Sequence, residues 1–274
     1  ALIALLRYEA KRPCAAFVFS LPRSGITTPM TIAILSALAE EQHGLVDAME
    51  GMQGQRHAGR DFWLGRLHGH EVVCALSGIG KVAAATTTAA LIERFGVRAI
   101  VFTGVAGGIG QGVNVGDVVI ARQFMQHDMD ASPIFPRWEM PGYGCSTLAC
   151  DGAMTDRLVQ AAASAVQAGI VASHASARLH EGLIASGDQF VSSRQASDRL
   201  RTELQAASHH VLAVEMEGAA VAQACFDYGV PFAAMRTISD RADDSAHVDF
   251  STFVRTVASR YAQLVVSDFL RQMP

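Results

Sequence analysis

Short apolar runs alternate along the chain with alanine-rich segments of helical periodicity. The first run covers residues 31–36, and further strands are predicted at 72–76 and 99–103. Between the last two, residues 81–95 form an Ala/Thr/Leu pattern typical of a helix, which is expected to end at Gly96. This alternation of strands and helices is the pattern of βαβ units around a mostly parallel sheet.

The second half of the chain continues this pattern after a break. Residues 128–152 are rich in proline, glycine and aromatic residues, which predicts a long loop, and loops of that length are often functional. Strands are expected at 117–122 and 182–186, and helices at 156–168, 217–228 and 251–270. No repeat or linker divides the chain. The sequence therefore predicts one three-layer α/β domain, with a mixed, mostly parallel central sheet flanked by helices.

Composition narrows the class of protein. Half of the 274 residues are hydrophobic and 18% are charged, which fits a buried sheet with tight turns. The net charge of -4, without a long Lys/Arg cluster, argues against nucleic acid or a membrane surface as the partner and favours a small molecule. No apolar stretch has the length of a membrane helix, so a cytoplasmic protein is expected. The five cysteines, without Cys-x-x-Cys spacing, predict neither a disulfide scaffold nor a zinc site.

The first 29 residues do not belong to the alternating pattern. Lys11 and Arg12 precede an apolar run at 14–21, which has the length of the apolar region of a secretory signal. No small-residue cleavage site is evident, however, and Met30 stands directly before the first predicted strand. We therefore expect residues 1–29 to be an extension outside the fold and residues 30–274 to form the domain.

Two glycine-rich turns follow predicted strands. The turn at 104–110 lacks the Gly-x-Gly-x-x-Gly spacing of dinucleotide sites, and strand-like sequence soon follows it. In the other turn, Lys81 is followed by Val82 rather than the Ser or Thr of a P-loop, and Ala75 replaces its first glycine. No cofactor is therefore expected. Both turns, Gly107 included, present bare backbone that a flat ring or a ribose could approach closely.

Carboxylates stand near the ends of three predicted strands. Asp240 follows the apolar residues Phe232, Ala233, Ala234, Met235 and Ile238. Glu215 and Glu217 follow another apolar run, and Glu41 follows the first strand. Because ligands of open α/β sheets bind at the carboxyl ends of strands, these acids can converge on one small molecule. Burial of Asp240 would favour its neutral form, which can donate a proton. The structural alternatives are a turn cap for Asp240 and helix N-termini, which favour acids, for the glutamates.

Five short segments occur in order along the chain: Ser77-Gly78-Ile79-Gly80-Lys81, Thr103-Gly104-Val105-Ala106-Gly107-Gly108, Ser186-Gly187-Asp188-Gln189-Phe190, Val214-Glu215-Met216-Glu217 and Ser239-Asp240. Together they resemble the bacterial 5'-methylthioadenosine/S-adenosylhomocysteine nucleosidases, which belong to the nucleoside phosphorylase/hydrolase superfamily. The resemblance covers residues 30–272. It implies a single nucleoside phosphorylase-like α/β domain that cleaves the N-glycosidic bond of an adenosine thioether without a cofactor.

The resemblance also implies roles for the matched residues. Glu41 would activate water, Asp240 would protonate the purine at N7, and Glu217 would hold the ribose hydroxyls. Phe190 would stack on the adenine, and the Val191 backbone would meet its Watson-Crick edge. The other implied binding or supporting residues are Val105, Gly107, Glu215, Met216 under the ribose, Arg236, Ser239, and Phe250, which would close over the ligand. Members of this family are typically homodimers, and residues 134–143 are the candidate for the loop that lines a neighbour's alkylthio pocket.

Two departures from the family pattern leave the substrate open. Many relatives carry serine where Val105 stands, near the ribose and the water, so one hydrogen bond must be lost or supplied elsewhere. The loop at 127–144 is also longer than in the commonest members.

Three alternatives to this reading remain. A phosphorolytic purine nucleoside phosphorylase would need cations around its phosphate, whereas Glu40 and Glu41 would repel it. A 6-amino-6-deoxyfutalosine hydrolase could use the same three acids with a different pocket for the 5' group. A binding module that lacks chemistry would have to bury its carboxylates without use.

Overall fold

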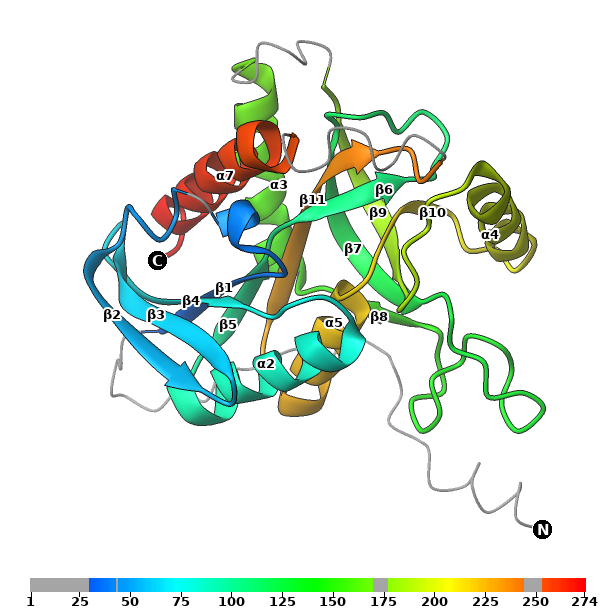
Figure 1. The fold of residues 1–274 in the computed structure, drawn as a ribbon, viewed down its shortest axis with the longest axis horizontal. Coiled ribbons are helices and arrows are strands. Elements are labelled where there is room, and N and C mark those ends of the chain that lie inside the picture. The colour runs from blue at the N-terminus through cyan, green and yellow to red at the C-terminus, as the bar shows by residue number, and fades with distance from the viewer. Residues whose placement is uncertain (1–29, 43, 170–176, 244–252) are drawn as a thin grey trace.

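The computed structural model describes residues 30–42, 44–169, 177–243 and 253–274 (Figure 1). The predicted extension at 1–29, the first residues of the predicted C-terminal helix and Phe250 lie outside these residues.

One mixed sheet of eleven strands forms the centre of the described part of the chain. Its strands are, in spatial order, β2 (Glu50–His57), β3 (Arg60–Leu67), β4 (His70–Leu76), β1 (Ile32–Ser36), β5 (Ala99–Phe102), β11 (Phe232–Asp240), β6 (Val105–Gly108), β10 (Val211–Glu215), β9 (Leu179–Ser186), β7 (Val118–Gln126) and β8 (Thr147–Ala149). Strand β1 pairs in parallel with β4 and β5, whereas β2, β3 and β4 are antiparallel. Strand β11 also pairs with β7, so that β11, β6, β10, β9 and β7 close into a ring.

Helices cover both faces of the sheet (Figure 1). Ile32 and Ile34 of β1 pack in the cluster that contains α3 (Gly152–Gln167) and α7 (Ser259–Arg271). Their neighbours Ala33 and Leu35 pack in the opposite cluster, with α2 (Lys81–Phe95) and α5 (Gly218–Tyr228). Because alternate residues of a strand point to opposite faces, two covered faces require a continuous apolar run. This is why the central strands were recognisable in the sequence.

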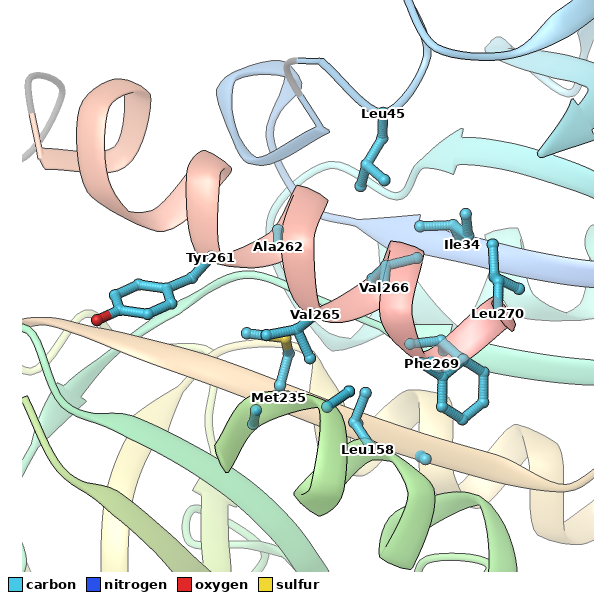
Figure 2. Packing of buried hydrophobic residues seen from close by; sticks show 14 of the residues in the cluster. Ile34, Leu45, Leu158, Met235, Tyr261, Ala262, Val265, Val266, Phe269 and Leu270 are labelled. Carbon is cyan, nitrogen blue, oxygen red and sulfur yellow. The ribbon is translucent and has the colours of Figure 1, made fainter. Parts of the chain in front are cut away.

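Helix α7 shows how the helices attach to the sheet. Its buried residues Ala262, Val265, Val266 and Phe269 follow the spacing i, i+3, i+4, i+7 and form one apolar stripe. Figure 2 shows this stripe facing Met235 of β11 and neighbouring side chains of α3. The stripe thus holds β11, which ends at Asp240, from the side of the sheet opposite α5.

Most of the predicted elements are confirmed, and their ends have local causes. Helix α2 covers the predicted residues and ends at Gly96, whose φ of 64° is left-handed. Helix α5 ends in the same way at Gly229, with a φ of 67°. Strands β10 and β11 end at Glu215 and Asp240, as the sequence predicts.

Other elements differ from the prediction. The segment after β1 forms a short 3-10 helix, η1 (Ala39–Gln42), and the C-terminal helix is preceded by a π-helical turn, η3 (Val254–Ala258). The glycine-rich turn contains strand β6, because the segment pairs with β11 and β10. The predicted loop contains β8, and α4 (Arg194–Ala206) and the β2–β3 hairpin were not predicted at all.

Cysteines and hydropathy add two facts. Cys74, Cys150 and Cys225 are free thiols, whereas Cys145 takes part in a disulfide, which the cysteine pattern did not predict. Among the described residues, no helix has both the length and the apolar character needed to span a membrane.

Candidate active site

A cavity of about 480 Å³ lies at the carboxyl ends of β1, β10 and β11 and beside the first residues of β6. Ten of the predicted site residues line it: Glu41, Val105, Gly107, Phe190, Val191, Glu215, Met216, Glu217, Ser239 and Asp240. Arg236 lies behind the wall, and Phe250 lies outside the described residues. The remaining lining residues were not predicted as site residues, although Ile79 belongs to one of the five matched segments and the others stand within four positions of a predicted residue: Ala37, Leu38, Ile79, Ala106, Gln189 and Val214.

Glu41 is held by the backbone of two loops. Its Oε2 accepts hydrogen bonds from the amides of Ala37 (2.8 Å) and Leu38 (2.9 Å), and its Oε1 accepts one from Val105 (3.1 Å). The residue is 3% exposed, and burial raises the pKa of its carboxyl although these bonds and Arg236 lower it. The carboxylate is therefore oriented and desolvated, as a general base requires.

Two glycines make room for two acids. A Cβ on Gly104 would stand 2.7 Å from Oε1 of Glu41, and a Cβ on Gly107 would stand 2.9 Å from Oδ1 of Asp240. Both distances are shorter than any ordinary contact of a Cβ atom. The glycines of the Thr-Gly-Val-Ala-Gly-Gly segment thus serve close packing of carboxylates rather than a phosphate loop.

Glu217 is the N-cap residue of α5 and projects toward the turn before α2. Its Oε1 accepts a hydrogen bond from the Gly80 amide at 2.8 Å. Burial, together with the nearby charge of Glu215, raises the pKa of Glu217 to about 8, whereas the Gly80 bond and Arg236 lower it. The carboxyl therefore takes up or releases its proton near neutral pH.

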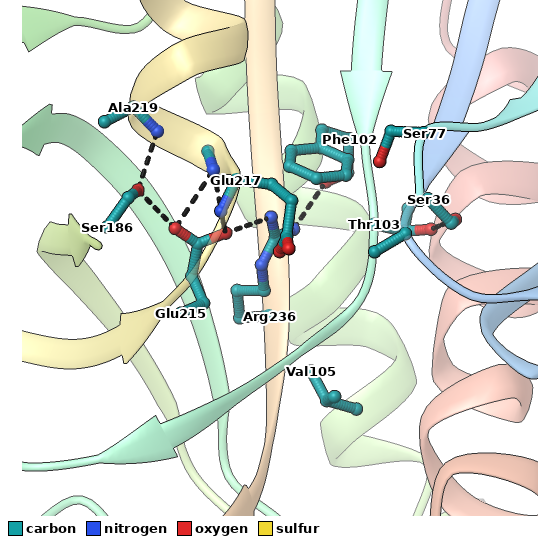
Figure 3. Close-up of polar contacts among 12 residues, drawn as sticks. Ser36, Ser77, Phe102, Thr103, Val105, Ser186, Glu215, Glu217, Ala219 and Arg236 are labelled. Carbon is teal, nitrogen blue, oxygen red and sulfur yellow. Dashed lines mark hydrogen bonds and ion pairs between the residues drawn. The ribbon is translucent and has the colours of Figure 1, made fainter. Parts of the chain in front are cut away.

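Glu215 has a structural task that the sequence left open. Its carboxylate accepts bonds from the Gly218 amide (2.8 Å), from the Ser186 hydroxyl and from Nη2 of Arg236 (2.7 Å), as Figure 3 shows. Arg236 is 1% exposed, and its guanidinium carbon lies 3.9 Å from the ring centroid of Phe102. A buried ion pair of this kind is secured by its surrounding hydrogen bonds. Glu215 thus joins the start of α5 to β11.

Asp240 is 7% exposed, and two donors fix it at the end of β11. The Ser239 hydroxyl donates to Oδ2 at 2.7 Å, and the Ala242 amide donates to Oδ1 at 2.8 Å. The second bond is the turn cap that was the structural alternative for this residue. Asp240 therefore both caps the turn and lines the cavity.

Val105 contributes its backbone to the site. Its amide binds Glu41, while its side chain packs on the apolar cluster of α3 and α7. Figure 3 shows the side chain directed away from the Glu215 network. The hydroxyls nearby, Ser36 and Thr103, bind each other at 2.9 Å. A serine at position 105 is thus not needed to hold Glu41.

Comparison with known proteins identifies the family. The sequence model of the phosphorylase superfamily matches residues 31–271. A 5'-methylthioadenosine/S-adenosylhomocysteine nucleosidase of Chromohalobacter salexigens is 38% identical over 234 residues, which is 85% of this chain and 94% of that protein.

Solved structures agree with the sequence comparison. The nucleosidase of that name from Neisseria meningitidis, in complex with methylthio-immucillin-A, is 34% identical with a TM-score of 0.79 and covers 89% of this chain and 99% of its own. A futalosine hydrolase of Helicobacter pylori is 32% identical with a TM-score of 0.78, and the match covers 89% of this chain and 98% of that chain.

Proposed function

Since the chain belongs to the phosphorylase superfamily and, within it, to the 5'-methylthioadenosine/S-adenosylhomocysteine nucleosidases, we propose that it hydrolyses 5'-methylthioadenosine, S-adenosylhomocysteine or both. The protein is a hydrolase of N-glycosyl bonds. The products would be adenine and a thioribose sugar. The observation that carries this proposal is the convergence of Glu41, Glu217 and Asp240, from three distant segments, on one cavity.

The mechanism assigns one task to each acid. Asp240 protonates N7 of the adenine, so that the base leaves as a neutral molecule and the bond breaks toward a ribosyl oxocarbenium ion. Glu41 removes a proton from the water that captures the cation, and its raised pKa makes it a better base than a solvated glutamate. Glu217 binds the ribose hydroxyls.

Electrostatics favour this route. Arg236 is buried behind the cavity and pairs with Glu215, whereas the carboxylate of Glu41 lines the cavity and accepts its hydrogen bonds from backbone amides. Negative charge stabilises a developing oxocarbenium ion. The same charge would repel an incoming phosphate dianion, which supports hydrolysis over phosphorolysis.

We extend the proposal to a homodimer. Ile79 and Phe190 line the cavity and are 60% and 48% exposed in the single chain, so apolar surface surrounds the opening. A neighbour's segment 134–143 would cover this surface and line the pocket for the alkylthio group. Sedimentation equilibrium would measure the mass, and a monomer at micromolar concentration would contradict the dimer.

The test of function is release of adenine from both nucleosides, with and without phosphate, together with identification of the sugar. We expect free adenine and a free thioribose sugar at a rate independent of phosphate. Dependence on phosphate, with a sugar 1-phosphate as product, would refute hydrolysis. Release from 6-amino-6-deoxyfutalosine alone would assign the chain to the activity of the futalosine hydrolase that it resembles.

A further inference from the structure

Three segments meet beside the cavity around Lys81, the first residue of α2. Lys81 Nζ donates to Asp128 Oδ1 at 2.5 Å and to Gln126 Oε1 at 3.0 Å, at the end of β7. The Lys81 amide donates to Asp188 Oδ1 at 2.8 Å, in the loop between β9 and α4. The Asp188 amide donates to Asp128 Oδ2 at 2.9 Å and closes the triangle. We name Lys81, Asp128 and Asp188 the loop clamp.

The loop clamp connects the two halves of the cavity. Gly80, the neighbour of Lys81, donates its amide to Glu217 on the ribose side. Asp188 directly precedes Gln189 and Phe190, which line the purine side. None of the three clamp residues lines the cavity itself. They are therefore placed to set the distance between the two halves without touching a ligand.

The turn at Gly80 transmits this constraint. Its φ of 98° lies in a backbone region that residues with a side chain rarely adopt, and a Cβ there would stand 3.2 Å from Oδ1 of Asp188. The turn is therefore specific in conformation and close to the acid that anchors it. A shift of the Lys81 amide also moves the Gly80 amide, because the two residues are adjacent in the chain.

A second chain of hydrogen bonds ties the clamp to the helix that begins after Glu217. Gln126 donates to Gln223 Oε1 at 2.8 Å, Gln223 donates to the Tyr143 hydroxyl at 3.1 Å, and that hydroxyl bonds to Asp227 at 2.8 Å. Gln223 and Asp227 belong to α5, whose N-cap is Glu217. The donor and the acceptor of the Gly80–Glu217 bond are thus both connected to Lys81: Gly80 is its neighbour in the chain, and Glu217 caps the helix that is linked through Gln223 and Gln126 to the Lys81 ammonium.

The charges favour a tight clamp. The Lys81 side chain is 15% exposed and the Asp128 side chain is 27% exposed, so the ion pair is only partly screened by solvent. Burial alone would raise the pKa of Asp128, but the bond from Lys81 and that from the Asp188 amide lower it. Charge-assisted bonds of this kind are about twice as strong as neutral ones.

We infer that Lys81 is a positioning residue that, through Asp128 and Asp188, sets the separation between the ribose side and the purine side of the cavity. This inference rests on the proposed function, because it requires a ligand that contains both a purine and a ribose. A ligand that fills only the purine side would not depend on the separation.

The experiment compares two ligands on the whole chain by calorimetry. One is adenine, and the other is an inert 7-deaza analogue of methylthioadenosine, which lacks the N7 proton acceptor. For Lys81→Met we expect binding of the nucleoside analogue to weaken about tenfold, the loss of roughly one charge-assisted bond. Binding of adenine should change less than about threefold, well below one tenfold step in affinity.

Arg122→Met is the matched control. Arg122 also bridges two acids, Asp156 at 2.6 Å and Glu181 at 2.5 Å, and none of these three residues lines the cavity. This control should bind both ligands as wild type does. Lys81→Arg, which keeps the charge, should recover part of the lost nucleoside affinity and so separate positioning from folding.

Each result has one meaning. Equal loss of adenine and nucleoside affinity in Lys81→Met would overturn the inference, and so would nucleoside affinity within about twofold of wild type, less than a third of a tenfold step. A wild-type protein that releases no adenine from any nucleoside would instead refute the proposed function.

Discussion

Replacing Gly104 by alanine tests whether the position of Glu41 controls turnover. The new Cβ would stand 2.7 Å from Oε1 of Glu41, where ordinary contacts begin at 3.4 Å, so the carboxylate must move by about the difference of 0.7 Å. The Gly104 backbone is outside the left-handed region, so alanine fits its conformation. The strain therefore falls on the side chain of Glu41.

The expected magnitudes separate activity from stability. Displacing a reacting group by about 1 Å costs about 100-fold in rate, which corresponds to about 2.7 kcal/mol in activation free energy. Moving Oε1 also weakens the bond from the Val105 amide, at a cost of about 1 kcal/mol. Replacing a glycine by alanine raises the free energy of unfolding by about 0.4–1 kcal/mol, because it lowers the conformational entropy of the unfolded chain. We expect kcat to fall about 100-fold while the free energy of unfolding changes by less than about 1 kcal/mol.

The assay is steady-state adenine release, with urea denaturation of the same samples. Gly152→Ala is the control, because Gly152 begins α3 and a Cβ there would meet nothing within 4 Å. It should keep wild-type turnover. A folded Gly104→Ala protein with kcat within about threefold of wild type, a barrier change below about 1 kcal/mol, would refute the assignment of Glu41 as the base.

Three further predictions concern the other acids. Asp240→Asn should bind the inert nucleoside analogue as wild type does but lose most turnover, and unchanged turnover would remove Asp240 as the proton donor. Because the pKa of Glu217 is raised to about 8 from 4.5, the folded state holds a proton that the unfolded state releases, so stability should fall as pH rises from 4.5 to 8. Glu217 contributes at most about 1.4 kcal/mol per pH unit to the slope of the free energy of unfolding against pH. Urea denaturation at several pH values should show that this slope is smaller by that amount in Glu217→Gln. Arg236→Met should lower the free energy of unfolding by about 3–5 kcal/mol, because it leaves Glu215 buried and unpaired. Arg122→Met removes two exposed ion pairs and should lower the free energy of unfolding by less than about 1 kcal/mol in the same urea assay. Equal losses in the two variants would contradict the buried-pair argument.

The strands that are buried on both faces could be located from the sequence alone. Residues 32–35 and 232–235 are continuous apolar runs because helices cover both faces of their strands, and that pattern is visible in the sequence alone. Gly96 and Gly229 likewise mark helix ends by a local conformational need. The acids after these strands could be located because the direction of a strand determines where its residues emerge.

Elements without a local signal were missed. Strand β2 is exposed along its whole length, so no alternation distinguishes it, and it exists because its backbone pairs with β3. Strand β6 has two glycines among four residues and owes its conformation to β10 and β11. In both, hydrogen bonds from distant segments override weak local preference.

How the acids are held depends on contacts between segments that are far apart in the sequence. Glu41 receives the amide of Val105 from 64 positions away, and Glu217 receives that of Gly80 from 137 positions away. The burial of Arg236, the room that Gly104 leaves for Glu41 and the loop clamp at Lys81 depend on the same distant contacts. A hydrophobic pattern encodes which face of an element is buried, whereas the partner of a buried polar atom depends on which segments meet when the sheet closes.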